Sequence, residues 1–257
     1  MPRKPRVKSE SHFYHVMLRG INHQNVFEDT SDKYKFLEIL TAVKGELGFK
    51  LISYCLMDNH VHLLISEDND DLSSIFRKIN TTYVIYFNQK YSRVGHLFQD
   101  RYKTESIKND AQLIQTVRYI HNNPVKGGLC AQPIDYRFSS YIDYLSNGDS
   151  ICDKSLVLGI LGSVDGFKEF SGCKADYKCM DLDEVRTSIG IDAARLIIQK
   201  EFPGANAQFF QSISKQERNR CIAILRGHNL SINQINRLTG ISIGVIQRIK
   251  ADDTSEF

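Results

Sequence analysis

The chain has 257 residues, of which 42% are hydrophobic and 25% charged, so it can bury a core and is long enough for one or two domains. No apolar run approaches the roughly 18 residues that a membrane span needs, and the segment 1–8 lacks the apolar stretch of a secretory signal. The six cysteines include no CxxC pair. This pattern argues against a disulfide framework or a zinc knuckle and favours reduced thiols in the cytoplasm.

Charge is unevenly distributed along the chain, although the net charge is only +3. Residues 206–250 carry seven basic residues against one acidic residue, a net charge of +6. Residues 143–201 carry eleven acidic against seven basic residues, a net charge of −4, and the first eight residues carry four positive charges. A basic arm and a basic C-terminal block suggest a nucleic acid partner. An ordinary basic surface is the alternative.

The first predicted elements are a strand, a helix and a hairpin. β-Forming residues at 13–19 predict a strand that ends at Gly20. An apolar stripe with serine and threonine at its start predicts a helix over 30–47. The alternating segment 49–57 and the segment 60–66 flank an Asp-Asn turn, which is typical of a β-hairpin.

A second helix, a strand and a third helix follow. The patterns predict a helix over 72–91, a short strand over 101–107 and a helix over 110–122, which Asn123-Pro124 should end because proline disfavours helix in the residue before it. The order β-α-β-β-α-β-α predicts an α+β domain with an antiparallel sheet and helices on one face.

The C-terminal part is expected to be helical after a less regular, glycine-containing stretch over 146–205. Capping-box spacing at Ser214 and at Ser231 marks two helix starts. Three helices are expected over 216–226, 232–239 and 243–250, with a glycine-containing turn at 240–242 between the last two. This is the spacing of a helix-turn-helix DNA-binding domain. A helical lid or a dimer contact is the alternative.

The segment His60-Val61-His62 carries a candidate metal site. Residues two apart on a strand project from the same face, so His60 and His62 present two imidazoles side by side, which suits one divalent cation. Val61 points into the core. A chance pair among eight histidines, facing solvent, is the alternative.

Tyr119 and Asn123 form a second candidate pair, because residues four apart share one face of a helix. A tyrosine hydroxyl can act as a nucleophile when a neighbouring group neutralises the charge on its target. A cation held by two histidines would do so at a phosphodiester, and Asn123 could supply a third, oxygen ligand. Alternatively, Asn-Asn-Pro is only a helix stop and Tyr119 is one of twelve tyrosines.

Several further motifs, in order over about residues 2–141, resemble those of the REP-associated tyrosine transposases, members of the HUH (histidine–hydrophobic–histidine) single-strand DNA endonuclease superfamily. The motifs are Pro2-Arg3-Lys4-Pro5-Arg6, Tyr14-His15-Val16, Arg19-Gly20, the run from Cys55 to Leu64, Phe87-Asn88, the run from Gly95 to Lys103, the run from Arg118 to Lys126, and Phe138-Ser139-Ser140-Tyr141.

The resemblance implies a ferredoxin- or RRM-like fold and a mechanism. His60 and His62 match the metal-binding pair, and Mg²⁺ or Mn²⁺ is the expected ion. Tyr119 matches the nucleophile that attacks a DNA phosphate, giving a 5′-phosphotyrosine and a free 3′-hydroxyl. The implied substrate is single-stranded DNA beside hairpin repeats, and the implied location is the bacterial cytoplasm, at the nucleoid.

Two positions depart from the pattern of related HUH transposases. Asn123 stands where a glutamine, longer by one methylene, is usual, which puts the third metal contact in doubt. Asp58 stands where a proline precedes Asn-His, which alters the hairpin turn and adds a carboxylate near the proposed metal.

The expected DNA contacts fall in two groups. In the first half, the predicted phosphate contacts are Arg3, Lys4, Arg6, Arg19, Arg101 and Lys103. The C-terminal helices look like the DNA-binding domain of bacterial replication initiators. On that basis Ser242, Gly244, Gln247 and Arg248 would face the major groove, with Arg237 and Lys250 on phosphates.

Together these patterns predict a transposase domain over 1–145, an acidic connector over 146–205 and a helix-turn-helix domain over 206–257. The predicted function is metal-dependent cleavage and rejoining of single-stranded DNA near hairpins by a monomer or homodimer. Two alternative functions remain: a non-catalytic DNA-binding regulator derived from such an enzyme, and a phosphoesterase in which the histidines activate water.

Overall fold

A four-stranded antiparallel sheet forms the centre of the N-terminal half. The computed structural model describes residues 9–67, 72–99, 101–146, 148–173 and 191–249. The strands are β1 (Phe13–Arg19), β2 (Lys50–Leu56), β3 (His60–Ser66) and β4 (Lys103–Ser106), in the order β2-β3-β1-β4. The predicted strands 13–19 and 60–66 and the hairpin between β2 and β3 are confirmed.

The fourth strand is shorter than predicted. Gln99 still bonds to Arg19, but regular pairing with β1 resumes only at Lys103, which lies opposite Met17. Arg101 therefore precedes β4, and its side chain is exposed. The pairing of β4 with β1 does not fix the direction of this side chain.

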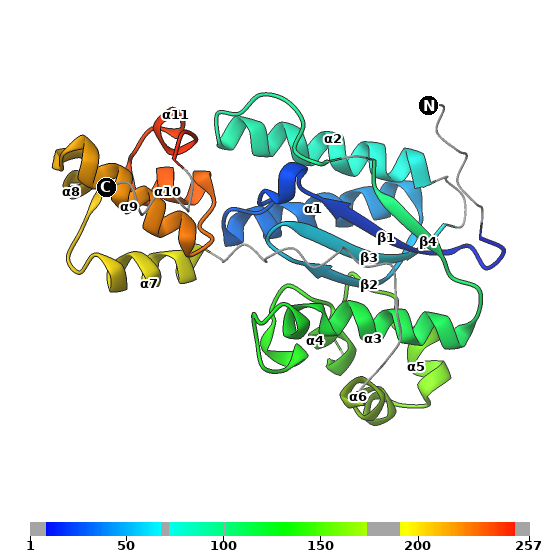
Figure 1. Ribbon diagram of the computed structural model, residues 1–257. Coiled ribbons are helices and arrows are strands. Elements are labelled where there is room, and N and C mark those ends of the chain that lie inside the picture. The colour runs from blue at the N-terminus through cyan, green and yellow to red at the C-terminus, as the bar shows by residue number, and fades with distance from the viewer. Residues whose placement is uncertain (1–8, 68–71, 100, 147, 174–190, 250–257) are drawn as a thin grey trace.

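Helices cover both faces of the sheet, as Figure 1 shows. α1 (Thr30–Leu47) and α2 (Leu72–Lys90) lie on one face, and α3 (Asp110–Lys126) lies on the other. The α+β class is confirmed, but the expectation of helices on one face only is wrong. The physical reason is that β2 and β3 are buried on both sides, so the face bearing Ile52 and Leu64 also needs an apolar cover.

α3 continues through Pro124 to Lys126, beyond the predicted stop. Proline removes one backbone donor, but the turn closes around it because the amide of Gly127 bonds to the carbonyl of Asn123 at 2.8 Å. Burial of Ile120 and Pro124 against the domain favours the helix. The extension keeps Asn123 inside the helix, one turn after Tyr119.

Three short helices from the predicted connector region and its border pack beneath α3. They are α4 (Tyr141–Leu145), α5 (Ser155–Leu161) and α6 (Val164–Gly172). Phe167 of α6 stacks on Tyr144 with ring centroids 4.6 Å apart, and both rings are fully buried. These helices therefore share the core under α3. The single-turn 3-10 helices η1 (Ile21–His23) and η2 (Pro133–Asp135) lie in loops.

Five helices form a separate C-terminal module with its own apolar core, at one end of the sheet (Figure 1). They are α7 (Ile191–Glu201), α8 (Ala207–Ser212), α9 (Lys215–Gly227), α10 (Ile232–Thr239) and α11 (Ile243–Ile246). The capping boxes at Ser214 and Ser231 are confirmed.

α11 is shorter than the predicted helix over 243–250. After Ile246 the backbone tightens to bonds between residues three apart, from Arg248 to Val245 and from Ile249 to Ile246, which ends the regular helix. No helix in the described part of the chain has the length and hydropathy of a membrane span.

Candidate active site

His60 and His62 lie on the face of the sheet that α3 covers, and Val61 points to the opposite core, as predicted. Their Nε2 atoms converge on one side chain of α3. His60 Nε2 lies 3.2 Å from Asn123 Oδ1, and His62 Nε2 lies 3.3 Å from Asn123 Nδ2. The two imidazoles and the amide, which are 63 and 61 residues apart, therefore meet at a single point.

Tyr119 lies beside this group, one helical turn before Asn123. Its ring centroid is 5.6 Å from that of His62 and 5.9 Å from that of His15, both in edge-to-face geometry. The tyrosine is half-buried, whereas His62 and His15 are fully buried. A phenol, two imidazoles and an amide thus occupy one small region between β3 and α3.

Neighbouring residues fix the tautomer of His60. Its Nδ1 lies 2.6 Å from the amide oxygen of Asn59, which can only accept, so Nδ1 carries the hydrogen. In the neutral ring, Nε2 is then an acceptor, and it faces the amide oxygen of Asn123 at 3.2 Å. A cation between these two acceptors would satisfy both of them.

A chain of hydrogen bonds orients His62 in a similar way. The amide nitrogen of Asn123 donates to His62 Nε2, so the hydrogen of the neutral ring lies on Nδ1, 2.9 Å from His15 Nε2. His15 Nδ1 then faces the carboxylate of Glu105 at 3.7 Å. Such partners hold a metal-binding histidine with its free nitrogen toward the ion.

The role of His15 is one that sequence reasoning missed. No second histidine stands two residues from it, so its spacing in the sequence does not mark it as part of a site. The register brings it to the site, because His15 lies opposite Leu64 on β3 and opposite Glu105 on β4. The alternation of β1 predicts which residues share a face of that strand. It does not show that His15 and His62 share a face of the sheet, because the sequence does not give the pairing of β1 with β3.

Burial keeps His62 neutral. Desolvation, followed by the nearby His60 and His15, lowers the pKa of His62 well below its usual value. Its Nε2 therefore keeps its lone pair at neutral pH, which would bind a cation in place of the hydrogen bond from Asn123.

The donor set fits a divalent cation only if Asn123 takes part. No group of three or more His, Cys, Asp or Glu side chains suited to a metal occurs in the described part of the chain. Two imidazoles and one amide oxygen form an incomplete shell of the kind that leaves positions for substrate. Asp58, the extra carboxylate, is ion-paired with the buried Lys33 at 2.6 Å and does not join the group.

A cleft of about 750 Å³ opens beside Tyr119, between α3 and the end of α6. Lys126 and Lys168 line it, and its described lining contains no acidic residue. Arg118 also lines it but is held by the carbonyls of Phe170 and Cys173, at 3.2 and 3.4 Å. Arg118 therefore fastens α6 to the helix that carries Tyr119.

Two predicted DNA contacts of the first half lie on the face of the histidines. Arg19 is directly opposite His60 on the neighbouring strand, and its guanidinium lies 2.9 Å from His23. Lys103 is opposite Met17, which is itself opposite His62, and is exposed. The arm residues Arg3, Lys4 and Arg6 lie outside the described residues.

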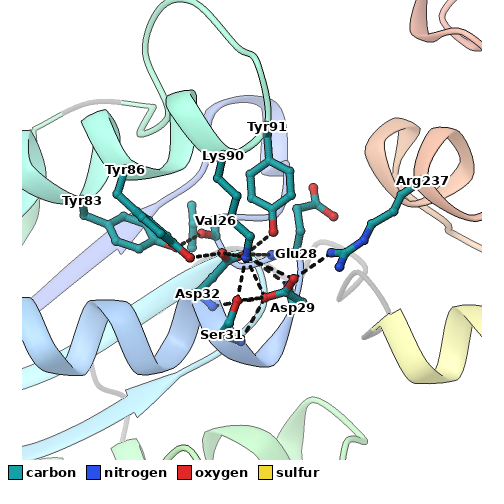
Figure 2. Close-up of polar contacts among 10 residues, drawn as sticks. All are labelled: Val26, Glu28, Asp29, Ser31, Asp32, Tyr83, Tyr86, Lys90, Tyr91 and Arg237. Carbon is teal, nitrogen blue, oxygen red and sulfur yellow. Dashed lines mark hydrogen bonds and ion pairs between the residues drawn. The ribbon is translucent and has the colours of Figure 1, made fainter.

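The predicted DNA contacts of the C-terminal module differ in exposure and in their partners. Ser242, Gly244, Gln247 and Arg248 are exposed, and Lys250 lies outside the described residues. Arg237, expected on a DNA phosphate, instead pairs with Asp29 at the start of α1, with Nη1 2.8 Å from Oδ2 (Figure 2). Tertiary docking of α10, which sequence cannot show, decides this contact.

Comparison with known proteins shows what the N-terminal domain is similar to. The profile of the family described as "Transposase IS200 like" matches residues 8–123, the segment that contains the sheet, both histidines, Tyr119 and Asn123. Residues 8–123 therefore resemble an IS200-like transposase domain.

Two curated proteins are similar to this chain in sequence. Over 138 residues the chain is 27% identical to the REP-associated tyrosine transposase of Escherichia coli (strain K12), covering 52% of this chain and 78% of that protein. Over 105 residues it is 31% identical to a Haemophilus influenzae protein assigned to the same group, covering 36% of this chain and 59% of that protein. The resemblance to REP-associated tyrosine transposases is confirmed.

A solved structure supports the fold. A REP-associated tyrosine transposase bound to a REP hairpin superposes with a TM-score of 0.50 at 20% identity, covering 61% of this chain and 96% of that one.

Proposed function

We propose that the protein cleaves and rejoins single-stranded DNA next to hairpin repeats, with Tyr119 as nucleophile. The observation that carries this proposal is the convergence of His60 Nε2, His62 Nε2 and the amide of Asn123, beside the ring of Tyr119. The preference for a hairpin comes from the relative that is bound to one.

In the proposed reaction, the Tyr119 oxygen attacks the phosphorus of a DNA phosphodiester. A bond forms between that oxygen and phosphorus, the bond from phosphorus to the 3′-oxygen breaks, the phenol loses its proton, and the 3′-oxygen takes one up. The product is a 5′-phosphotyrosine and a free 3′-hydroxyl. Because one ester replaces another, the reverse attack by a 3′-hydroxyl rejoins DNA without an energy source.

His60, His62 and Asn123 would hold Mg²⁺ or Mn²⁺, which when bound neutralises charge that builds on the phosphate oxygens. The chain supplies orientation for this step. Asn59 holds His60, and His15 holds His62, so both rings keep their Nε2 atoms toward Asn123. α3 carries Asn123 and Tyr119 on one rigid face, which fixes the phenol relative to the imidazoles.

The cleft between α3 and α6 suits the strand that carries the scissile phosphate. Lys126 and Lys168 line it together with Tyr119, and side chains of this kind neutralise backbone phosphates without reading sequence. Since α6 builds one wall, we propose that the catalytic unit extends through α6 and that the connector begins after it, beyond the boundary at 145 expected from sequence.

We further propose that α9, α10 and α11 form a helix-turn-helix that binds duplex DNA through Ser242, Gly244, Gln247 and Arg248, which are exposed. A cytoplasmic, nucleoid-associated location follows from a DNA substrate of this kind.

The test is adduct formation. Labelled single-stranded flanks of the protein's own gene, incubated with Mn²⁺, should give a protein–DNA band on a denaturing gel. Tyr119→Phe should abolish the band and leave binding intact. Tyr141→Phe is the matched control, because Tyr141 lines the same cleft and is expected to have no chemical role.

The alternatives give different results. DNA that is cut by the wild-type protein and by the Tyr119→Phe variant at equal rates, without an adduct, would identify a phosphoesterase that uses water. DNA that is bound but never cut, with Mg²⁺ or Mn²⁺ present, would identify a regulator.

A further inference from the structure

A second cleft, of about 590 Å³, separates the transposase domain from the C-terminal module. One wall comes from the segments 22–28 and 93–94 of the transposase domain. The other comes from the end of α9, the start of α10 and α11. The cleft is therefore built by two parts of the chain that are far apart in sequence.

Polar contacts hold the two walls together. Arg237 pairs with Asp29 at 2.8 Å, and the amide of Asn233 donates to the carboxylate of Glu28 at 3.1 Å. Figure 2 shows Arg237 reaching from the C-terminal module to Asp29, which Lys90 also contacts at 2.9 Å. These two contacts join the walls of the cleft.

The lining is of the type that contacts nucleic acid. It is rich in amide, imidazole and guanidinium groups, namely Asn22, His23, Gln24, Asn25, Arg93, Arg226, Asn229, Asn233 and Gln247. One acidic residue, Glu28, is among the described lining residues, and it is 3% exposed and bonded to Asn233. An anion in the cleft would therefore meet chiefly donors.

Two nitrogens of this lining, His23 Nδ1 and Arg93 Nη1, are buried and have no hydrogen-bond partner within the described chain. Arg19 can only donate, so His23 Nε2 accepts its hydrogen bond at 2.9 Å, and the hydrogen of the neutral imidazole lies on Nδ1. Both nitrogens are therefore donors. Buried donors are normally paired, so an acceptor that reached these two nitrogens through a small side-chain movement would be stabilised here.

Residues of the same lining have a left-handed backbone conformation. His23 and Asn229 adopt left-handed conformations, with φ of 60° and 62°, one on each wall. Non-glycine residues rarely take this conformation, and where they do the cost is often connected with function.

The cleft is linked to the candidate active site. Arg19, which bonds to His23, lies directly opposite His60 in the sheet. On the other wall stands Gln247, an exposed residue of the proposed helix-turn-helix. A molecule in the cleft would lie between the two proposed DNA sites.

We propose that this interdomain cleft binds the sugar–phosphate backbone of duplex DNA that extends the hairpin beyond its own stem, beside the cleaved strand. His23 and Arg93 would donate to phosphate oxygens from one wall, while Gln247 contacts the duplex from the other. The two modules then read one continuous substrate, with the duplex fixed relative to Tyr119. This inference rests on the proposed function in taking DNA that is cleaved at Tyr119 as the substrate and Gln247 as a duplex contact.

The test compares two DNA molecules bound by the full-length Tyr119→Phe variant, so that cleavage does not disturb the equilibrium. One is the single-stranded hairpin from the flank of the protein's own gene. The other is the same hairpin extended by about one turn of duplex, roughly 10 base pairs. Affinity is measured by fluorescence anisotropy at several salt concentrations.

Arg93→Gln and Gln247→Ala should each weaken binding of the extended hairpin, Arg93→Gln by about tenfold as expected for one charge-assisted contact. Arg93→Gln should also reduce the salt dependence by about one phosphate contact. Binding of the unextended hairpin should change by less than about twofold. Arg77→Gln is the matched control, because Arg77 is exposed on α2 and does not line the cleft.

Unchanged affinity of both variants for the extended hairpin would overturn the proposal, as would an equal loss on both DNA molecules. Gln247→Ala guards against misfolding, since its side chain is exposed. If the wild-type protein forms no adduct but the duplex effects appear, the proposed function fails and the cleft stands. If the adduct forms without duplex effects, only the cleft fails.

Discussion

Replacing Glu28 by glutamine should stabilise the protein at alkaline pH. Glu28 is 3% exposed, and burial, together with the nearby Asp32 and Asp58, raises its pKa from 4.5 to about 7. Hydrogen bonds from Asn233 and Asn25 oppose the shift only in part. The folded protein therefore binds this proton more tightly than the unfolded chain does.

The sign and size of the effect follow from this difference. A raised pKa contributes stability that is complete below pH 4.5 and is lost as the pH rises through 7. A difference of 2.5 pH units corresponds to a loss of about 3 kcal/mol in the free energy of unfolding. Glutamine keeps an oxygen that accepts from Asn233 but carries no charge.

The assay is urea unfolding followed by circular dichroism at pH 4.5, 6 and 8. Glu28→Gln should match the wild-type protein at pH 4.5 and exceed its free energy of unfolding by up to about 3 kcal/mol at pH 8. Glu38→Gln, at an exposed position on α1, should change it by less than about 0.5 kcal/mol at every pH. A Glu28 variant that is no more stable than the wild-type protein at pH 8 would refute the reasoning.

Three further outcomes are expected. Asn123→Ala should weaken Mn²⁺ binding, measured by calorimetry, at least about tenfold, whereas Asn122→Ala should not; equal affinities would remove the amide from the site. Phe167→Ala should lower the free energy of unfolding of the N-terminal α+β domain by about 3–5 kcal/mol; a loss below about 1 kcal/mol would show that α6 is not part of its core. Asp29→Asn keeps a residue that can cap α1 but removes the ion pair with Arg237. Hydrogen exchange of the amides in α10 should therefore become faster. An unchanged exchange rate would mean that this ion pair does not hold the C-terminal module against the sheet domain.

The pKa of Asp29 shifts in the opposite direction to that of Glu28. Burial by itself raises the pKa of Asp29, but hydrogen bonds from Ser31, Lys90 and Arg237 outweigh it and hold the pKa below its usual range. Asp29 therefore stays ionised, and its pair with Arg237 should persist from acidic to alkaline pH. Glu28, one residue earlier, is the group that titrates near neutrality.

Local pattern determined much of the architecture. The helix over 30–47 and the strands 13–19 and 60–66 follow from periodicity and capping, because these signals act between residues close in sequence. The same local rules placed His60 and His62 on one face of a strand. They also placed Tyr119 and Asn123 on one face of a helix. The motifs around these residues sufficed to indicate the transposase family.

Only the tertiary structure decided how these groups meet. Pairing of β1 with β3 brought His15 to His62, although the two are 47 residues apart. Packing carried α3 through Pro124, against the local preference of proline, and so kept Asn123 on the helix beside both imidazoles. Docking of α10 took Arg237 to Asp29, 208 residues away. In each case the energy comes from contacts between distant segments, which periodicity and local propensity do not encode.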